Sequence, residues 1–231
     1  MDVFRWCGHD GGVALAVLFD FGDTLFRRSG EAEAIVEIGA QHDCPIDPGA
    51  ARAFWKAIHE RARSPEEIAR ARDLSPEAHR REWTRLFSAA DVLLPGMGRA
   101  LYERETDPEK WVPYPDTDRC LAALRSRGVA IGVVSDTGWD IRSVFSIRGL
   151  DRFVDSWVLS YEHGAVKPAT SLFAAACRAL GVAPSEALMV GDNPLTDGGG
   201  VAAGVPTLIL PQVAPGAPRG LDCVERICGG D

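Results

Sequence analysis

The stretch VALAVLFDFGDT, residues 13–24, points to the fold of this chain. Its first seven residues are apolar without interruption, a pattern typical of a short parallel strand that is buried on both faces of a sheet. The apolar run ends at Asp20, which opens a polar turn that continues to Thr24. Because ligands of parallel sheets bind at the carboxyl ends of the strands, the pattern predicts that Asp20 lies at a binding site.

Apolar runs that alternate with helical segments resume near residue 114. We expect strands at 129–134, 153–159, 187–190 and 205–210, helices at 120–127, 140–147, 170–180 and 197–203, and a short helix at 221–227. Strands and helices that alternate in this way are joined by right-handed crossovers. The sequence therefore predicts an α/β fold with a doubly wound, Rossmann-like parallel sheet.

The segment from 27 to 110 shows no strand pattern and contains signals of helix starts. Ser64 and Ser75 each precede a proline and early acidic residues, a combination typical of helix N-termini. Apolar residues at helical spacing predict the inner faces of these helices: Phe54, Ile58, Trp83, Leu86 and Phe87. We therefore expect an α/β core formed by residues 1–26 and 111–231, with an all-helical domain inserted at 27–110.

The composition excludes several classes of protein. Of the 231 residues, 46% are hydrophobic and 25% are charged, which is ordinary for a globular domain and excludes a disordered chain. The 33 acidic and 25 basic residues give a net charge of −8, which argues against nonspecific nucleic-acid binding. No apolar run is long enough to cross a membrane, and no basic flank precedes the first run as in a secretory signal.

Six cysteines stand at positions 7, 44, 120, 177, 223 and 228, without a C-x-x-C pair. This pattern favours free thiols over a disulfide framework or a zinc site. We therefore expect the protein to be cytoplasmic. The sequence does not indicate its oligomeric state.

Three of the expected strands end in polar residues suited to joint chemistry: Asp20, Ser135 and Asp192. Carboxylates that converge on one sheet edge repel each other unless a cation lies between them, and a hard divalent ion such as Mg²⁺ takes oxygen ligands. Asp197 follows Asp192 by five residues, and Lys167 supplies a fixed cation. Metal, lysine, hydroxyl and carboxylate nucleophile together are the groups that phosphoryl transfer uses.

Four segments of the chain resemble, in order, the four motifs of the haloacid dehalogenase (HAD) superfamily of hydrolases. They are LFDFGDTL at 18–25, VVSDT at 133–137, GAVKP at 164–168 and VGDNPLTD at 190–197. One such motif alone is weak, but four in the family's order are specific, and the resemblance spans residues 13–210. It implies a HAD core with a helical cap domain inserted after the first strand, and a Mg²⁺-dependent phosphatase that acts on a small-molecule phosphate ester.

The resemblance also implies roles for individual residues. Asp20 would be the nucleophile and would form an aspartyl-phosphate. Ser135 would bind the transferring phosphoryl group, and Lys167 would hold its charge and steady Asp20. Thr24 would fix the loop that follows the first strand. The residues that would bind the phosphate also include Thr24 and Asp136.

The implied metal ligands are Asp20, the backbone carbonyl of Gly22, and Asp192. Asp197 would assist directly or from outside the ligand shell. Without the resemblance, Asp197 can equally be read as an acidic residue at a helix N-terminus, where the dipole favours it.

The first motif departs from the family pattern at Gly22, where the family usually has a second aspartate that protonates the leaving alcohol. General acid–base catalysis contributes about 10²–10⁴-fold, so its loss weakens turnover of poor leaving groups. Asp23, one residue later, is a candidate for the missing acid. The alternative is that Asp23 is a plain turn residue.

Two other functions stay open at this point. A haloacid dehalogenase shares the aspartate nucleophile but needs no metal, and the acidic fourth motif favours the phosphatase over it. A weakly active binding or regulatory protein is the alternative that Gly22 suggests. The five histidines lack the spacing of metal ligands, and the arginines of segment 61–81 are expected to be mostly solvated.

Overall fold

The computed structural model describes residues 14–214 and 216–229 of the chain. Its main sheet has five parallel strands in the order β5-β4-β1-β6-β7. The strands are β1 (Ala16–Phe19), β4 (Ala130–Ser135), β5 (Ser156–Leu159), β6 (Ala187–Gly191) and β7 (Thr207–Ile209). The sheet confirms the α/β fold with a doubly wound parallel sheet, and each strand lies within a predicted run or one residue beyond it.

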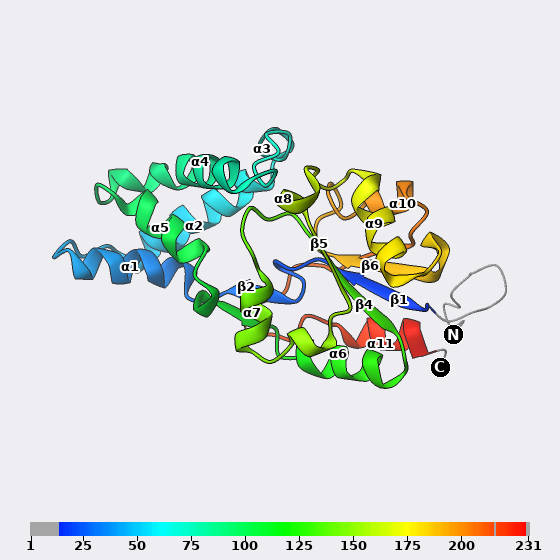
Figure 1. Ribbon diagram of the computed structural model, residues 1–231. Coiled ribbons are helices and arrows are strands. Elements are labelled where there is room, and N and C mark those ends of the chain that lie inside the picture. The colour runs from blue at the N-terminus through cyan, green and yellow to red at the C-terminus, as the bar shows by residue number, and fades with distance from the viewer. Residues whose placement is uncertain (1–13, 215, 230–231) are drawn as a thin grey trace.

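The two faces of the sheet are covered by different helices, as Figure 1 shows. Val17 and Phe19 of β1 belong to the hydrophobic core on the side of α6 (Thr117–Ser126), α7 (Arg142–Ile147) and α11 (Asp222–Gly229). Ala16 and Leu18 point to the core on the side of α9 (Thr170–Leu180), near which α10 (Gly199–Ala202) and α8 (Ser160–His163) lie. Because successive strand residues face opposite sides, a strand buried on both faces must be apolar throughout. This explains the uninterrupted apolar run.

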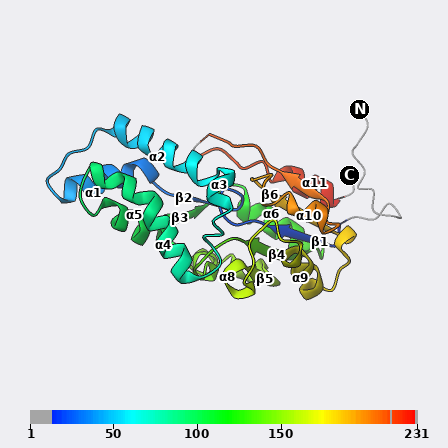
Figure 2. The ribbon, with the colours of Figure 1, turned by 90° about the horizontal axis from the view of Figure 1, so that it is seen from above.

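A helical unit is inserted between β1 and the rest of the sheet. It contains α1 (Glu31–Gln41), α2 (Pro48–Ala62), α3 (Pro65–Ile68), α4 (Pro76–Phe87) and α5 (Met97–Glu105). The serines predicted as helix starts are the N-caps of α3 and α4, where their hydroxyl oxygens accept hydrogen bonds from the backbone N–H groups of Glu67 and Ala78. Figures 1 and 2 place this unit beyond one end of the sheet, the end that carries the polar turn after β1.

The prediction that segment 27–110 is entirely helical is wrong at its base. Phe26–Arg28 forms β2, which pairs antiparallel with β3 (Trp111–Pro113) in a separate two-stranded sheet. β2 straddles the predicted boundary at 26/27, and β3 begins directly after the one at 110/111. Strands of three residues are too short for a periodic pattern, so the sequence gives no sign of them.

Two further expectations are met among the described residues. Cys44, Cys120, Cys177, Cys223 and Cys228 are free thiols, while Cys7 lies outside the described part of the chain. Within residues 14–214 and 216–229, no helix is both long and apolar enough to span a membrane.

Candidate active site

The candidate site lies at the carboxyl edge of the three central strands. Phe19, the last residue of β1, is in register with Val133 of β4 and Val190 of β6. Asp20, Ser135 and Asp192 therefore leave neighbouring strands at nearly the same level. They line a cavity of about 160 Å³ between the sheet edge and the helical unit. The sequence-based prediction that these residues meet is confirmed by their positions.

Lys167 lies at the centre of the site and is only 3% exposed. Its Nζ donates to Asp20 Oδ1 and to Asp197 Oδ1, each at 2.6 Å. Burial alone would lower the pKa of Lys167, but the nearby carboxylates of Asp197 and Asp20 raise it above its usual value. The ammonium group therefore stays charged and fixes one oxygen of Asp20.

Asp197 closes the loop that follows β6. Its Oδ2 accepts hydrogen bonds from the backbone N–H groups of Asp192 at 3.0 Å and Asn193 at 2.9 Å, while Oδ1 contacts Lys167. The side chain is completely buried. Both oxygens of Asp197 are thus engaged in holding the loop and the lysine in place.

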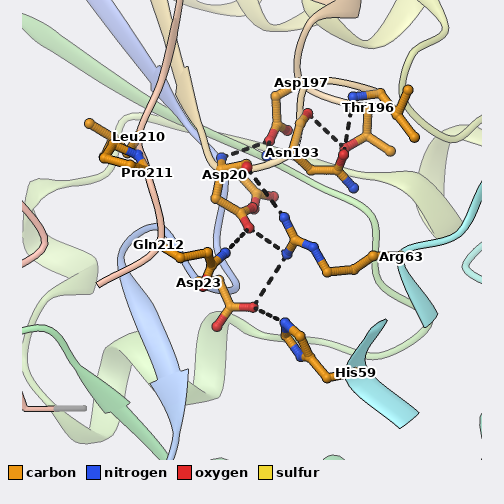
Figure 3. Close-up of polar contacts among 12 residues, drawn as sticks. Asp20, Asp23, His59, Arg63, Asn193, Thr196, Asp197, Leu210, Pro211 and Gln212 are labelled. Carbon is orange, nitrogen blue, oxygen red and sulfur yellow. Dashed lines mark hydrogen bonds and ion pairs between the residues drawn. The ribbon is translucent and has the colours of Figure 1, made fainter. Parts of the chain in front are cut away.

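Asp192 is contacted from two distant parts of the chain. Arg63, at the C-terminal end of α2, donates from Nη1 to Asp192 Oδ2 at 2.6 Å and from Nη2 to the Asp192 backbone oxygen at 3.3 Å. Gln212 Nε2 donates to Asp192 Oδ2 at 3.3 Å. Arg63 also lies 3.7 Å from the Asp23 carboxylate, and Figure 3 shows its guanidinium group next to that side chain. The helical unit therefore contacts the core directly at the site.

The donor set suits a hard divalent cation. Asp20, Asp192 and Asp197 are buried, and each can present an oxygen within 4.8 Å of the other two. Asp20 Oδ2 and Asp192 Oδ1 accept no hydrogen bond from the described residues, whereas both oxygens of Asp197 do. Oxygen ligands of this kind are those that hard cations prefer. The free oxygens of Asp20 and Asp192 fit metal ligation, and Asp197 fits a supporting position.

Burial has the largest effect on the pKa values of Asp20 and Asp192. It raises the pKa of Asp20 well above its usual value, against the lowering effect of Lys167, and the carboxylates of Asp197 and Asp192 add to the rise. Burial likewise raises the pKa of Asp192 to about 6, although Arg63 opposes the shift. A cation among these groups would favour their ionised forms, because it supplies the compensating charge that burial removes.

Ser135 and Asp136, the two residues of the second motif that are expected to bind phosphate, both line the cavity but differ in their contacts. Ser135 is 2% exposed and lines the cavity. Asp136 also lines it, but its Oδ1 accepts a hydrogen bond from the backbone N–H of Lys167 at 2.9 Å. This contact fits positioning of the lysine loop better than direct binding of a phosphate.

Thr24 does not lie where phosphate binding requires. Its side chain is completely buried, does not line the cavity, and its hydroxyl has no hydrogen-bond partner among the described residues. The expectation that Thr24 contacts the phosphate is therefore not supported by its position. The expectation rested on the position of Thr24 in the first motif, and that position does not determine the direction of the side chain.

The unusual backbone angle of the turn after β1 lies at Asp23. Gly22 does not have a positive φ, whereas Asp23 has φ 57° in the left-handed region. The Asp23 carboxylate lies 3.7 Å from Arg63 and 3.8 Å from His59, and Figure 3 shows it turned toward these two residues.

Several residues that line or contact the site were not predicted from the sequence, among them His59, Arg63 and Gln212. His59 and Arg63 belong to the helical unit, where they were read as residues without a role and as part of a solvated face. Gln212 lies in the Pro- and Gly-rich tail after β7. The i,i+4 spacing of His59 and Arg63 shows only that they share a helix face. No signal in the sequence says what that face contacts.

Comparisons with known proteins agree with this geometry. A family model described as haloacid dehalogenase-like hydrolase matches residues 15–204. A glyceraldehyde 3-phosphate phosphatase from Methanopyrus kandleri is 31% identical over 190 residues, which cover 77% of this chain and 75% of that protein. Two other curated relatives match over shorter stretches, so this chain spans only 44% and 34% of the lengths of those two proteins.

Solved structures share the fold over nearly the whole chain. A HAD phosphatase from Thermococcus onnurineus is 26% identical, with 94% of this chain and 98% of that chain covered and a TM-score of 0.61. An L-2-haloacid dehalogenase from Xanthobacter autotrophicus is 20% identical, with 88% and 80% covered and a TM-score of 0.62, which indicates the fold alone. With the family match over most of its length and the four motifs brought together at one edge of the sheet, this chain belongs to the haloacid dehalogenase-like hydrolases.

Proposed function

We propose that this protein is a Mg²⁺-dependent phosphatase that hydrolyses a small phosphomonoester through an aspartyl-phosphate intermediate. The observation that supports the proposal is the contact of Lys167 with Asp20 and Asp197 beside Asp192, because these groups suit a nucleophile, a fixed cation and metal ligands next to one cavity. Relatives named as phosphatases support the reaction class. The buried acidic cluster favours a phosphatase over a metal-independent dehalogenase.

In the first step, an oxygen of Asp20 attacks the phosphorus atom while the bond from phosphorus to the alcohol oxygen breaks. Lys167 steadies the attacking carboxylate and draws the phosphoryl charge, and the Ser135 hydroxyl donates to a phosphoryl oxygen. The departing oxygen takes a proton from an acid or from water. In the second step, water attacks phosphorus and loses a proton, the bond to Asp20 breaks, and inorganic phosphate leaves.

Asp20, Asp192 and the backbone carbonyl of Gly22 would hold the metal, and Asp197 would support them through the loop it closes. When bound, Mg²⁺ offsets the repulsion between the attacking carboxylate and the phosphate. The helical unit at 31–105 would act as a cap, since Arg63, His59 and Trp83 reach the cavity from it. Such a cap excludes water and restricts access to small substrates.

A metal-controlled activity screen tests the proposal. Purified protein is incubated with a panel of phosphomonoesters in the presence of Mg²⁺, after addition of a chelator, and after Mg²⁺ is restored. We expect release of phosphate that the chelator stops and the metal restores. Release of halide from 2-haloacids regardless of the chelator would identify a dehalogenase instead, and no turnover of either class would leave a binding protein.

Mg²⁺ is expected to raise the melting temperature of the wild-type protein, because a ligand that binds only the native state stabilises it. At about 100 times its Kd the gain is about 2.7 kcal/mol, which corresponds to about 5–10 °C for a chain of this size. Asp192→Ala should abolish the shift, because it removes a carboxylate of the cluster. Differential scanning calorimetry with and without Mg²⁺ measures the effect.

Asp118→Ala provides the control, since Asp118 is an exposed acid on α6 outside the cavity. It should keep the full shift. An equal shift in Asp192→Ala, or none in the wild type at millimolar Mg²⁺, would remove the metal assignment.

A further inference from the structure

A second cavity of about 640 Å³ adjoins the candidate active site. It lies between α2, β2 and the segment 212–214, and we call it the α2 groove. Four residues line both the α2 groove and the active-site cavity: Asp23, Arg28, His59 and Arg63. The groove therefore begins where the cavity ends. A substrate held by its phosphate at Asp20 has room to extend into it.

One face of α2 carries basic residues along the length of the groove, and burial lowers the pKa of His59 among them, which favours its neutral form. Arg52, Lys56, His59 and Arg63 line it, and their spacings of four, three and four residues put them on one side of the helix. With a rise of about 1.5 Å per residue, Lys56 lies about 10 Å and Arg52 about 16 Å along the helix from Arg63. Arg27 of β2 lines the groove as well.

Two of these cations have no protein partner within the described part of the chain. Arg63 is engaged by Asp192, and Lys56 lies 3.7 Å from Glu60. By contrast, neither Arg27 nor Arg52 forms an ion pair or a side-chain hydrogen bond with a described residue, and the Nε of Arg27 is buried without an acceptor.

Among the described residues, the acids that line the groove do not pair with these two arginines. Asp23 faces Arg63 and His59, and Glu60 faces Lys56. Glu33, the other acid given for the lining, is exposed and forms no ion pair with a described residue. Most other arginines in the described part of the chain form ion pairs with carboxylates, as Arg28 and Arg85 do, so two arginines without such a pair in one groove are unusual.

We propose that the α2 groove binds a second anionic group of the substrate, a phosphate or a carboxylate, through Arg27 and Arg52. The proposal rests on the proposed phosphatase function, because it places the scissile phosphate at Asp20. A guanidinium group offers several N–H donors in a fixed plane that matches such anions. Along α2, Arg52 lies about 16 Å from Arg63, which lines the active-site cavity, so the second anionic group would lie well away from the scissile phosphate. The preferred substrate is thus an extended molecule with an anion at each end.

A ladder of synthetic substrates tests this directly. Linear alkanediols of increasing length are prepared as monophosphates and as α,ω-bisphosphates, and kcat/KM per phosphate group is measured for each pair with Mg²⁺. For the wild type we expect the ratio of bisphosphate to monophosphate to rise with chain length and to reach about 10–100-fold, the effect of one or two hydrogen bonds to a charged group. A ratio near one at every length would overturn the proposal.

Substitutions then assign the preference to the groove. The double variant Arg27→Gln/Arg52→Gln should bring the ratio close to one. Arg99→Gln, which changes an exposed arginine of α5 outside both cavities, should keep the wild-type ratio. If Arg27→Gln proves unstable, Arg52→Gln alone should lower the ratio, since Arg52 is exposed on the helix surface. A double variant that retains the full preference would overturn the assignment.

Binding without turnover separates this proposal from the proposed function. The Kd of non-hydrolysable alkane bisphosphonates is measured by calorimetry for the wild type and the double variant. Weaker binding in the variant supports the groove even if no phosphomonoester is hydrolysed. Hydrolysis of monophosphates without any bisphosphate preference, together with equal binding by both proteins, would leave the phosphatase standing and remove the groove.

Discussion

Asp20→Asn is expected to lower kcat by at least about 1,000-fold while the protein stays folded. An amide is a far poorer nucleophile than a carboxylate of nearly the same volume. The fold should tolerate the change, because burial already raises the pKa of Asp20 and makes its charge unfavourable in the native state. Lys167 keeps Asp197 as a partner at 2.6 Å. Steady-state kinetics and the melting temperature of the metal-free protein give the two readouts.

The covalent step has its own signature in this experiment. Acid quenching of the wild type with radiolabelled substrate should trap label on the protein, and Asp20→Asn should trap none. Asp118→Asn is the control, because Asp118 is an exposed acid on α6. This variant should behave as the wild type in both assays. Retention of more than a few per cent of activity in Asp20→Asn, with contamination excluded, would contradict a nucleophilic role.

The centre of the parallel sheet could be predicted because β1, β4 and β6 are buried almost throughout. These three strands are apolar runs that end at polar residues, and such runs are visible without any knowledge of their neighbours. The convergence of Asp20, Ser135 and Asp192 followed from the same logic, since adjacent parallel strands end at one edge. The apolar pattern of each strand and the rule that parallel strands end at one edge were sufficient to predict where these three residues lie.

The contacts between distant segments could not be predicted in this way. Arg63 meets Asp192 across 129 positions of sequence, and Gln212 approaches the same carboxylate from the tail. The orientation of the helical unit relative to the sheet depends on the two segments that connect them. These segments form the β2·β3 pair, which the sequence does not reveal. Helix periodicity identifies the buried face of α2 but not what its polar face touches.

The catalytic consequence of Gly22 is the point on which the structure adds most. A Cβ at this position would come no closer than 3.7 Å to any atom, that atom being in the Trp111 ring, and the backbone is not in the left-handed region. Nothing in the backbone therefore requires glycine here. Asp23 is held in the left-handed region instead, with its carboxylate toward Arg63 and His59.

If the enzyme lacks the acid that an aspartate at position 22 would supply, its rate should depend steeply on the leaving group. An aryl phosphate departs as a stabilised phenolate and needs little protonation, whereas an alkyl phosphate departs as a basic alkoxide. General acid catalysis contributes about 10²–10⁴-fold, so alkyl esters should lag behind aryl esters by about that factor. Values of kcat/KM for a series of esters of graded leaving-group pKa measure the slope. Gly22→Asp should flatten it, because the space around the Cβ accepts the new side chain.

Asp23→Asn distinguishes the remaining explanations for the proton. Asparagine tolerates the left-handed backbone that Asp23 adopts, so the variant tests the carboxyl group without straining the turn. If Asp23 is the acid, its replacement should lower kcat/KM by about 100-fold or more on alkyl esters and little on aryl esters. Since its carboxylate is turned toward Arg63 and His59, we expect instead that both ester classes respond alike. A selective loss on alkyl esters would show that Asp23 leaves these partners during turnover and donates the proton itself.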